Sequence, residues 1–365
     1  METPPNAKSA ANINPAKTIR ANDWFSAGKR VFYDTKNKKF LLNGENGEAK
    51  KIVQIHTRID KDETQTDGSV WASFMPGWPD GSYGWSRVNQ HLSGQNIGHR
   101  LFFDYVGLGD SDKPADYPYS TIERADMMEA LWKANGIKST FIFSFDYSSL
   151  VTLELLCRQE DLIKAGIEPE TRIEGVLLMN GGLYADGHSH PWFTTPILKS
   201  WMGGFVTSLA QRSKTIFAEL MKPLWSKDYK VTAEEIEQLF DAIGRRKGIY
   251  AMSKSADFVS YHKKNAERMD LSRLYRSMRD AVSFHVVGSE QDPFEGRQAY
   301  LAKERLGAEG LDVRILPGGH LTTSEHPDLI ADIILDVGPS SEKFKTAKSA
   351  REKPLRETTR KLKVS

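Results

Sequence analysis

The stretch from Thr140 to Cys157 constrains the fold more than any other part of the chain. It begins with a run of β-branched and aromatic residues, Thr140 to Phe143, which is typical of a buried strand. It ends with residues 150–157, whose length and apolar spacing predict a helix. The few residues between them, 144–148, must turn the chain sharply, with Asp146 at the tip. We therefore expect a strand, a tight turn and a helix.

Similar apolar runs recur along the chain, and they predict a parallel sheet. Helical patterns such as Ile122 to Ala134 lie between several of them, which is typical of a sheet covered by helices on both faces. The sequence thus predicts an α/β fold. The runs are Val70–Phe74, Arg100–Asp104, Gly175–Met179, Val282–Val287 and Val313–Leu316.

Two segments near the beginning have a different pattern. Lys29 to Asp34 and Lys51 to Asp60 alternate polar and apolar residues, which is typical of strands with one buried face. The turn signals Asn43-Gly44 and Asn46-Gly47 lie between them. We expect antiparallel strands here.

Residues 183–279 contain helical patterns without a strand pattern. The clearest is Ala233 to Arg246, where Thr232 and Glu235 form a capping box and Gly248 is expected to end the helix. An insertion at this point would lie over the carboxyl ends of the strands, so we interpret it as a helical lid.

These patterns divide the chain into five parts. We expect an N-terminal extension (1–28), a first core part (29–182), the lid (183–279), a second core part (280–338) and a disordered basic tail (339–365). The tail is rich in Lys and Arg and poor in large apolar residues, a composition typical of disorder.

Composition excludes several classes of protein. Of 365 residues, 39% are hydrophobic and 27% charged, with a formal net charge of +2, so the chain lacks the signature of a nucleic-acid-binding protein. It has no zinc-type ligand spacing, and we expect neither a metal nor a cofactor. The single Cys157 excludes a disulfide within the chain and favours a reducing compartment. No stretch resembles a signal peptide or approaches the roughly 20 apolar residues of a membrane span, so we expect a cytoplasmic protein. The oligomeric state stays open.

Three candidate catalytic residues each follow a predicted strand. Asp146 follows Phe143, Asp292 follows Val287, and His320 follows Leu316. Each alone has an ordinary structural explanation, such as a helix cap for Asp146 and an Asp-Pro turn for Asp292. Their order of nucleophile, acid and histidine, after the three expected strands, is that of a nucleophile-elbow hydrolase.

Two backbone amides are candidates for stabilising negative charge in the same site. The loop Met75 to Asp80 follows the first parallel strand, where Trp78 would supply one N–H, and Tyr147 after the nucleophile would supply the other.

These residues resemble the α/β-hydrolase superfamily over Val70 to Val337, and within it the branch of epoxide hydrolases and haloalkane dehalogenases that uses an Asp nucleophile. Residues 103–114 are a particularly specific match, and Asp146-Tyr147 and Asn180-Gly181-Gly182 are similar to the mesoderm-specific transcript protein group. The resemblance implies a covalent alkyl ester on Asp146, which His320, oriented by Asp292, would hydrolyse with water.

The chain also departs from this family. Pro76 and Phe145 stand where His is usual, and Tyr147 stands where both enzyme groups have Trp. Trp78-Pro79 resembles the epoxide hydrolase pattern, which implies a cis peptide bond there.

The sequence leaves three functions open. An epoxide hydrolase acting on a small apolar electrophile is favoured, a haloalkane dehalogenase is the alternative, and a non-catalytic binding protein is the third. Lid residues that could assist a leaving group are Tyr229, Tyr250 and Tyr261 for an epoxide, and Trp192 and Trp201 for a halide.

Overall fold

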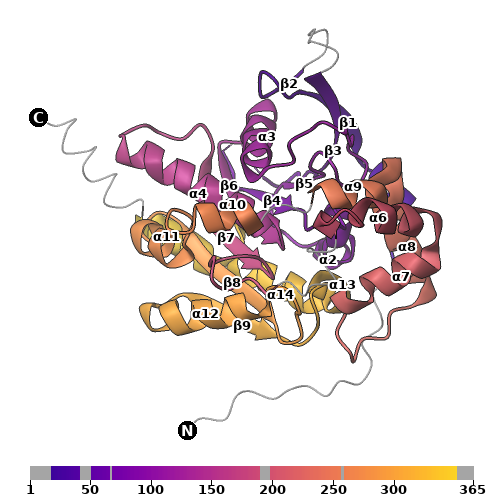
Figure 1. The fold of residues 1–365 in the computed structure, drawn as a ribbon. Coiled ribbons are helices and arrows are strands. Elements are labelled where there is room, and N and C mark those ends of the chain that lie inside the picture. The colour runs from indigo at the N-terminus through magenta and orange to yellow at the C-terminus, as the bar shows by residue number, and fades with distance from the viewer. Residues whose placement is uncertain (1–17, 42–50, 66–67, 190–197, 256–258, 352–365) are drawn as a thin grey trace, which may run out of the picture.

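A nine-stranded mixed sheet forms the centre of the molecule (Figure 1). The computed structural model describes residues 18–41, 51–65, 68–189, 198–255 and 259–351. In spatial order the strands are β2 (Lys39–Phe40), β1 (Lys29–Asp34), β3 (Ile52–Asp60), β5 (Arg100–Phe103), β4 (Trp71–Met75), β6 (Ser139–Phe145), β7 (Arg172–Met179), β8 (Ser283–Ser289) and β9 (Asp312–Leu316).

Strand direction divides this sheet into two regions. β1 pairs antiparallel with β2 and β3, and β3 pairs antiparallel with β5. From β5 to β9 every pairing is parallel. The predicted strands, including the two antiparallel ones, are therefore confirmed, whereas the short β2 was not foreseen. The turn signals at Asn43 and Asn46 lie outside the described residues.

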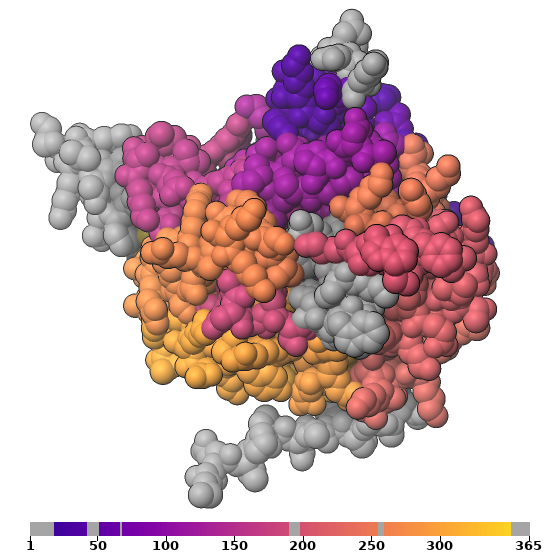
Figure 2. Space-filling view, viewed as in Figure 1, coloured from indigo at the N-terminus to yellow at the C-terminus, as the bar shows by residue number. Residues whose placement is uncertain are grey.

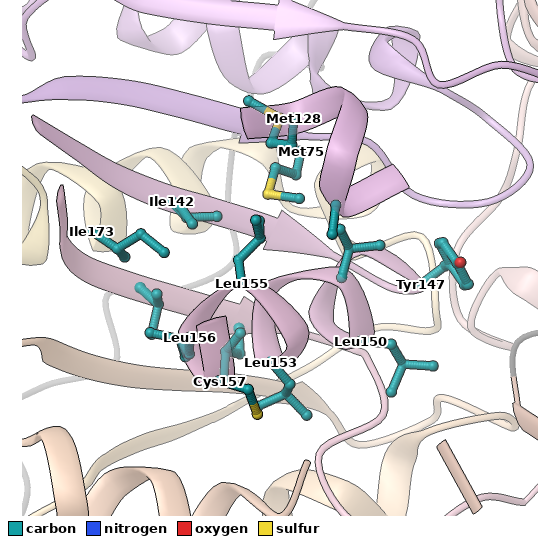
Figure 3. Close-up of a cluster of buried hydrophobic side chains, with 14 of the residues drawn as sticks. Met75, Met128, Ile142, Tyr147, Leu150, Leu153, Leu155, Leu156, Cys157 and Ile173 are labelled. Atoms are coloured by element: carbon teal, nitrogen blue, oxygen red, sulfur yellow. The ribbon is translucent and has the colours of Figure 1, made fainter. Parts of the chain in front are cut away.

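Helices cover both faces of the parallel region. One face packs against α3 (Thr121–Ala134), α4 (Ser148–Lys164), α11 (Leu271–Met278) and α12 (Gly296–Leu306). The other packs against α1 (Ala21–Ser26), α2 (Ser86–Leu92) and α14 (Pro327–Val337). Alternation along β6 explains this arrangement, because Phe141 and Phe143 enter one core and Ile142 enters the other. Figure 3 shows the core that contains Ile142, where β4, β6 and β7 meet α3 and α4.

A group of helices separates β7 from β8, within the interval predicted to form a lid. These are α6 (Gly203–Arg212), α7 (Lys214–Met221), α8 (Ala233–Gly244), α9 (Gly248–Ser255) and α10 (Val259–Lys264), joined by the short η3 (Lys222–Leu224) and η4 (Arg245–Lys247). α11, also within the predicted interval, packs on α4 and belongs to a layer of the sheet.

These helices, the predicted lid, are tied to loops that follow the carboxyl ends of strands. Leu224 O accepts a hydrogen bond from Leu321 N, just after β9, and Arg245 pairs with Asp110 after β5. Glu235 pairs with Arg87 of α2, after β4. These contacts hold the lid at the edge of the sheet where Asp146, Asp292 and His320 lie.

Two local predictions were wrong. The Thr232–Glu235 capping box is present, but its helix ends at Gly244, and Gly248 begins α9 instead of ending α8. The predicted disordered tail is helical over residues 342–351. Phe344 anchors it, because its buried ring lies 5.5 Å from that of Phe141, and Lys348 pairs with Glu174. Residues 352–365 lie outside the described part.

None of the helices in the described residues is long and apolar enough to cross a membrane. The same residues contain no group of three or more His, Cys, Asp or Glu side chains arranged to hold a metal ion.

Candidate active site

The predicted turn between strand and helix is present, with Asp146 at its tip. Asp146 has a left-handed backbone (φ 51°) between β6 and α4, and its amide donates to Met179 O on β7 (2.8 Å). The close packing requires small neighbours. A Cβ added at Gly181 would lie 2.2 Å from Asp146 O, and the buried hydroxyl of Ser148 donates to Pro76 O. The turn therefore fixes Asp146 against the loop that carries Trp78.

The three predicted catalytic side chains converge. His320 Nε2 lies 3.3 Å from Asp146 Oδ1, and His320 Nδ1 lies 2.9 Å from Asp292 Oδ2. The amides of Phe294 and Glu295 donate to Asp292 Oδ1, which holds this carboxylate in place (2.8 and 3.2 Å). The geometry can carry a nucleophile, a base and a group that orients the base.

Asn180, which directly follows β7 where an acid could have stood, supports the loop that carries His320. The side-chain Nδ2 of Asn180 donates to His320 O (2.8 Å) and to Ser289 Oγ (2.9 Å). The carboxylate that contacts His320 Nδ1 comes from the loop after β8, as predicted.

Trp78 and Tyr147 were predicted to supply two amides. The amide of Trp78 donates to Asp146 Oδ2 (2.9 Å), and the Trp78–Pro79 peptide bond is cis, as predicted. Tyr147 occupies the N-cap position of α4 without a side-chain capping bond, and its hydroxyl lies 3.1 Å from Thr121 Oγ1 on α3. One predicted amide is thus placed on the nucleophile, and the Tyr147 side chain is directed to the helix layer.

The surroundings of His320 favour its charged form. Burial opposes an imidazolium, but the charge of Asp292 and the hydrogen bonds to Asp146 and Asp292 outweigh it and raise the pKa of His320 well above its usual value. The rings of Phe145 and Phe294 lie 5.5 and 5.2 Å from the imidazole. Phe145 thus forms part of an apolar wall. A Cβ at Gly77 would lie 2.4 Å from its ring, so Gly77 makes room for it.

Sequence analysis missed Asp80, a second carboxyl beside the nucleophile. It is 1% exposed, and its Oδ1 has no hydrogen-bond partner among the residues that the structure describes. Gly84 makes room for it, since a Cβ there would lie 1.9 Å from Asp80 Oδ2. Burial, and then the charge of Asp146, raise the pKa of Asp80 to about 7, against the effect of His320. The only signal in the sequence is an acid directly after Trp78-Pro79.

Arg124 was missed as well. Its guanidinium lies 4.1 Å from the ring centre of Tyr147 and 5.1 Å from that of Tyr105. The side chain is fully buried, and none of its nitrogens has a hydrogen-bond partner within the described ranges. It thus places a positive charge behind the turn. The signal was a cation on the inward-facing side of α3, four residues before the buried Met128.

The lid residues proposed to assist a leaving group do not converge on Asp146. The hydroxyl of Tyr229 bonds to Glu235 and Arg87, and that of Tyr261 lies 3.4 Å from Glu154. Tyr250 is half-exposed. Trp201 is 90% exposed, so its indole points into solvent and cannot bind a halide beside Asp146 in this conformation. Trp192 lies outside the described residues.

A sequence profile of the alpha/beta hydrolase family matches residues 74–333, most of the chain. The chain belongs to this family. The Mesoderm-specific transcript protein of Mus musculus is 27% identical over 199 residues, which are 53% of this chain and 57% of the relative. The chain therefore matches little more than half the length of that relative.

Solved alpha/beta hydrolase structures agree with the fold. A loop variant of the haloalkane dehalogenase DbeA from Bradyrhizobium elkanii has a TM-score of 0.58 at 15% identity, with 83% of this chain and 96% of that chain covered. A thermophilic esterase from Thermogutta terrifontis has a TM-score of 0.56 at 14% identity, with 84% and 96% covered. Because the two neighbours carry different activities, the likeness supports the fold and leaves the chemistry to the site.

Proposed function

We propose that this protein is a hydrolase that forms a covalent alkyl ester on Asp146. The observation that carries the proposal is the division of the Asp146 carboxylate between two partners. Oδ2 accepts from the Trp78 amide, while Oδ1 faces His320. Oδ1 then attacks a saturated carbon, and Oδ2 becomes the oxyanion when water attacks the ester.

Charge coupling supports this order of steps. The negative charge of Asp146 is one cause of the raised pKa of His320. Ester formation removes that charge, so the pKa of His320 falls and the imidazolium releases its proton, which the oxygen of the opened epoxide takes up directly or through water. The neutral imidazole can then accept a proton from the water that attacks the ester. Asp292 stabilises the imidazolium that forms.

An epoxide is the proposed electrophile, because Trp78 followed by Pro79 resembles epoxide hydrolases and Tyr147 replaces the Trp whose indole holds halide in dehalogenases. Haloalkane dehalogenation is the alternative, because it would use the same Asp146 ester and the same His320 and Asp292. A non-catalytic binding protein remains the third hypothesis. A cytoplasmic location belongs to the same proposal.

The test separates the two half-reactions. The His320→Gln variant is incubated with epoxides and haloalkanes, and its intact mass and peptides are measured. We expect one alkyl group on the peptide that contains Asp146, and the mass gained identifies the electrophile. The Asp146→Asn variant should gain no mass, and Asp241→Asn, a change at an exposed carboxylate of α8, should behave as the parent.

A label on another peptide, or no label with a compound that the parent turns over, would refute the covalent mechanism. If the parent turns over neither class, the binding-protein hypothesis takes its place.

A further inference from the structure

Helix α6 in the lid is packed with its large apolar side chains outward. Its buried residues are small: Gly203, Thr207 and Ala210. This face packs against α9. On the outer side Phe205 is 64% exposed and Leu209 38%, and Trp201, one turn before Phe205, is 90% exposed. The spacing of four residues places Phe205 and Leu209 on one face of α6, and Trp201 lies in the turn just before the helix.

The apolar surface continues onto the next helix. Ile216 and Leu220 of α7 are exposed and also four residues apart, and Met202 is exposed beside Trp201. α6 and α7 pack against each other. In Figure 2 their red atoms form part of the outer surface on the right of the view. We call Trp201, Met202, Phe205, Leu209, Ile216 and Leu220 the lid patch. Contiguous exposed apolar surface of this kind marks an interaction site.

The charge around the lid patch is positive. Residues 198–218 contain Lys199, Arg212 and Lys214 and no Asp or Glu. The acids beside them are Glu219, which pairs with Lys222, Glu237, which pairs with Lys214, and Asp241, whose charge also acts on Lys214. Across α9, residues 245–255 contain four further cations and no acid, two of them paired with Asp110 and Asp112.

We propose that the lid patch binds the surface of a bilayer that contains anionic lipid. Trp201 and Phe205 would enter the boundary between headgroups and acyl chains, and Lys199 and Arg212 would contact lipid phosphates. An exposed helix face with Trp, Phe and Leu, bordered by Lys and Arg, is the composition of peripheral membrane helices. A second copy of the chain fits less well, because the same patch facing itself would bring like charges together. The proposal does not depend on the chemistry of Asp146.

Vesicle binding by the full chain tests this. We expect sedimentation with phosphatidylcholine vesicles that contain phosphatidylserine, much less with phosphatidylcholine alone, and release by salt. The double variant Trp201→Ser, Phe205→Ser should bind at least about a hundredfold more weakly, since each buried aromatic side chain contributes more than about 1.4 kcal/mol, a factor of about ten. Lys199→Gln with Arg212→Gln should remove most of the preference for anionic vesicles.

The matched control is Ile163→Ser with Ile167→Ser, which changes two side chains that are 44% and 54% exposed elsewhere on the surface. It should bind as the parent does. Because all the altered side chains are exposed, an unchanged Tm checks that each variant folds. Equal binding by the parent and the Trp201/Phe205 variant would overturn the proposal, as would no binding to anionic vesicles. Loss of a dimer in that variant, without any vesicle binding, would identify the patch as a self-interface and also overturn it.

Discussion

Replacing Asp80 with Asn should stabilise the fold in a manner that depends on pH. Asn has nearly the same shape and never ionises, so the change isolates the proton of Asp80. The carboxyl is 1% exposed, and its pKa is raised from the usual 3.8 to about 7. Burial is the largest cause, followed by the charge of Asp146.

The sign follows from proton binding. The unfolded chain releases the Asp80 proton near pH 3.8, whereas the folded chain keeps it until about pH 7. Between these values the folded state binds one proton more, so raising the pH lowers the free energy of unfolding by about 1.4 kcal/mol per pH unit. In the Asn variant the free energy of unfolding does not fall for this reason, because Asn does not ionise. Its advantage should grow from near zero at low pH to roughly 4 kcal/mol above pH 7.

Urea unfolding of parent and variant from pH 4.5 to pH 8 measures this difference. Other carboxyl groups are common to both proteins, and Asp241→Asn, at an exposed position, controls for the loss of one charge. A difference that stays constant with pH, or that shrinks as pH rises, would refute the protonated, buried Asp80.

Three further predictions concern the core and the site. Leu156→Ala should lower the free energy of unfolding by about 2–5 kcal/mol in urea titrations, because its fully buried side chain leaves a cavity, whereas Leu209→Ala on the exposed face of α6 should change it by less than about 0.5 kcal/mol. Tyr147→Phe keeps its backbone amide, so the rate at which a substrate alkylates Asp146 should stay within about twofold. Loss of the hydrogen bond between Tyr147 and Thr121 should lower the free energy of unfolding, measured by thermal denaturation, by about 1 kcal/mol. His320→Gln should destabilise the fold most below pH 6.5, because a raised pKa stabilises the folded state there, and its unfolding free energy should approach that of the parent as pH rises through the folded pKa.

The strands and the chain order of Asp146, Asp292 and His320 could be predicted because both depend on local patterns. A buried parallel strand is a short apolar run, and Asp146, Asp292 and His320 each follow one. Parallel strands that end at one edge bring such residues together, so chain order sufficed to predict the convergence of these side chains.

Asp80 and Arg124 could not be assigned in the same manner, because their properties come from distant neighbours. Gly84 makes room for Asp80, and the charge of Asp146 helps to raise its pKa. The position of Arg124 is defined by the rings of Tyr105 and Tyr147. The helix at 342–351 was missed for a similar reason. Its composition is polar, and it is held in place by the buried ring of Phe344 and by the salt bridge between Lys348 and Glu174 of β7.

The left-handed backbone of Asp146 sets folding and function against each other at one residue. A non-glycine residue with φ 51° costs about 1 kcal/mol or more, and glycine would relieve that strain. A lineage released from the need for a carboxylate here would gain stability by replacing it. In such a lineage we expect substitution of Asp146 before any change in the surrounding strand and helix.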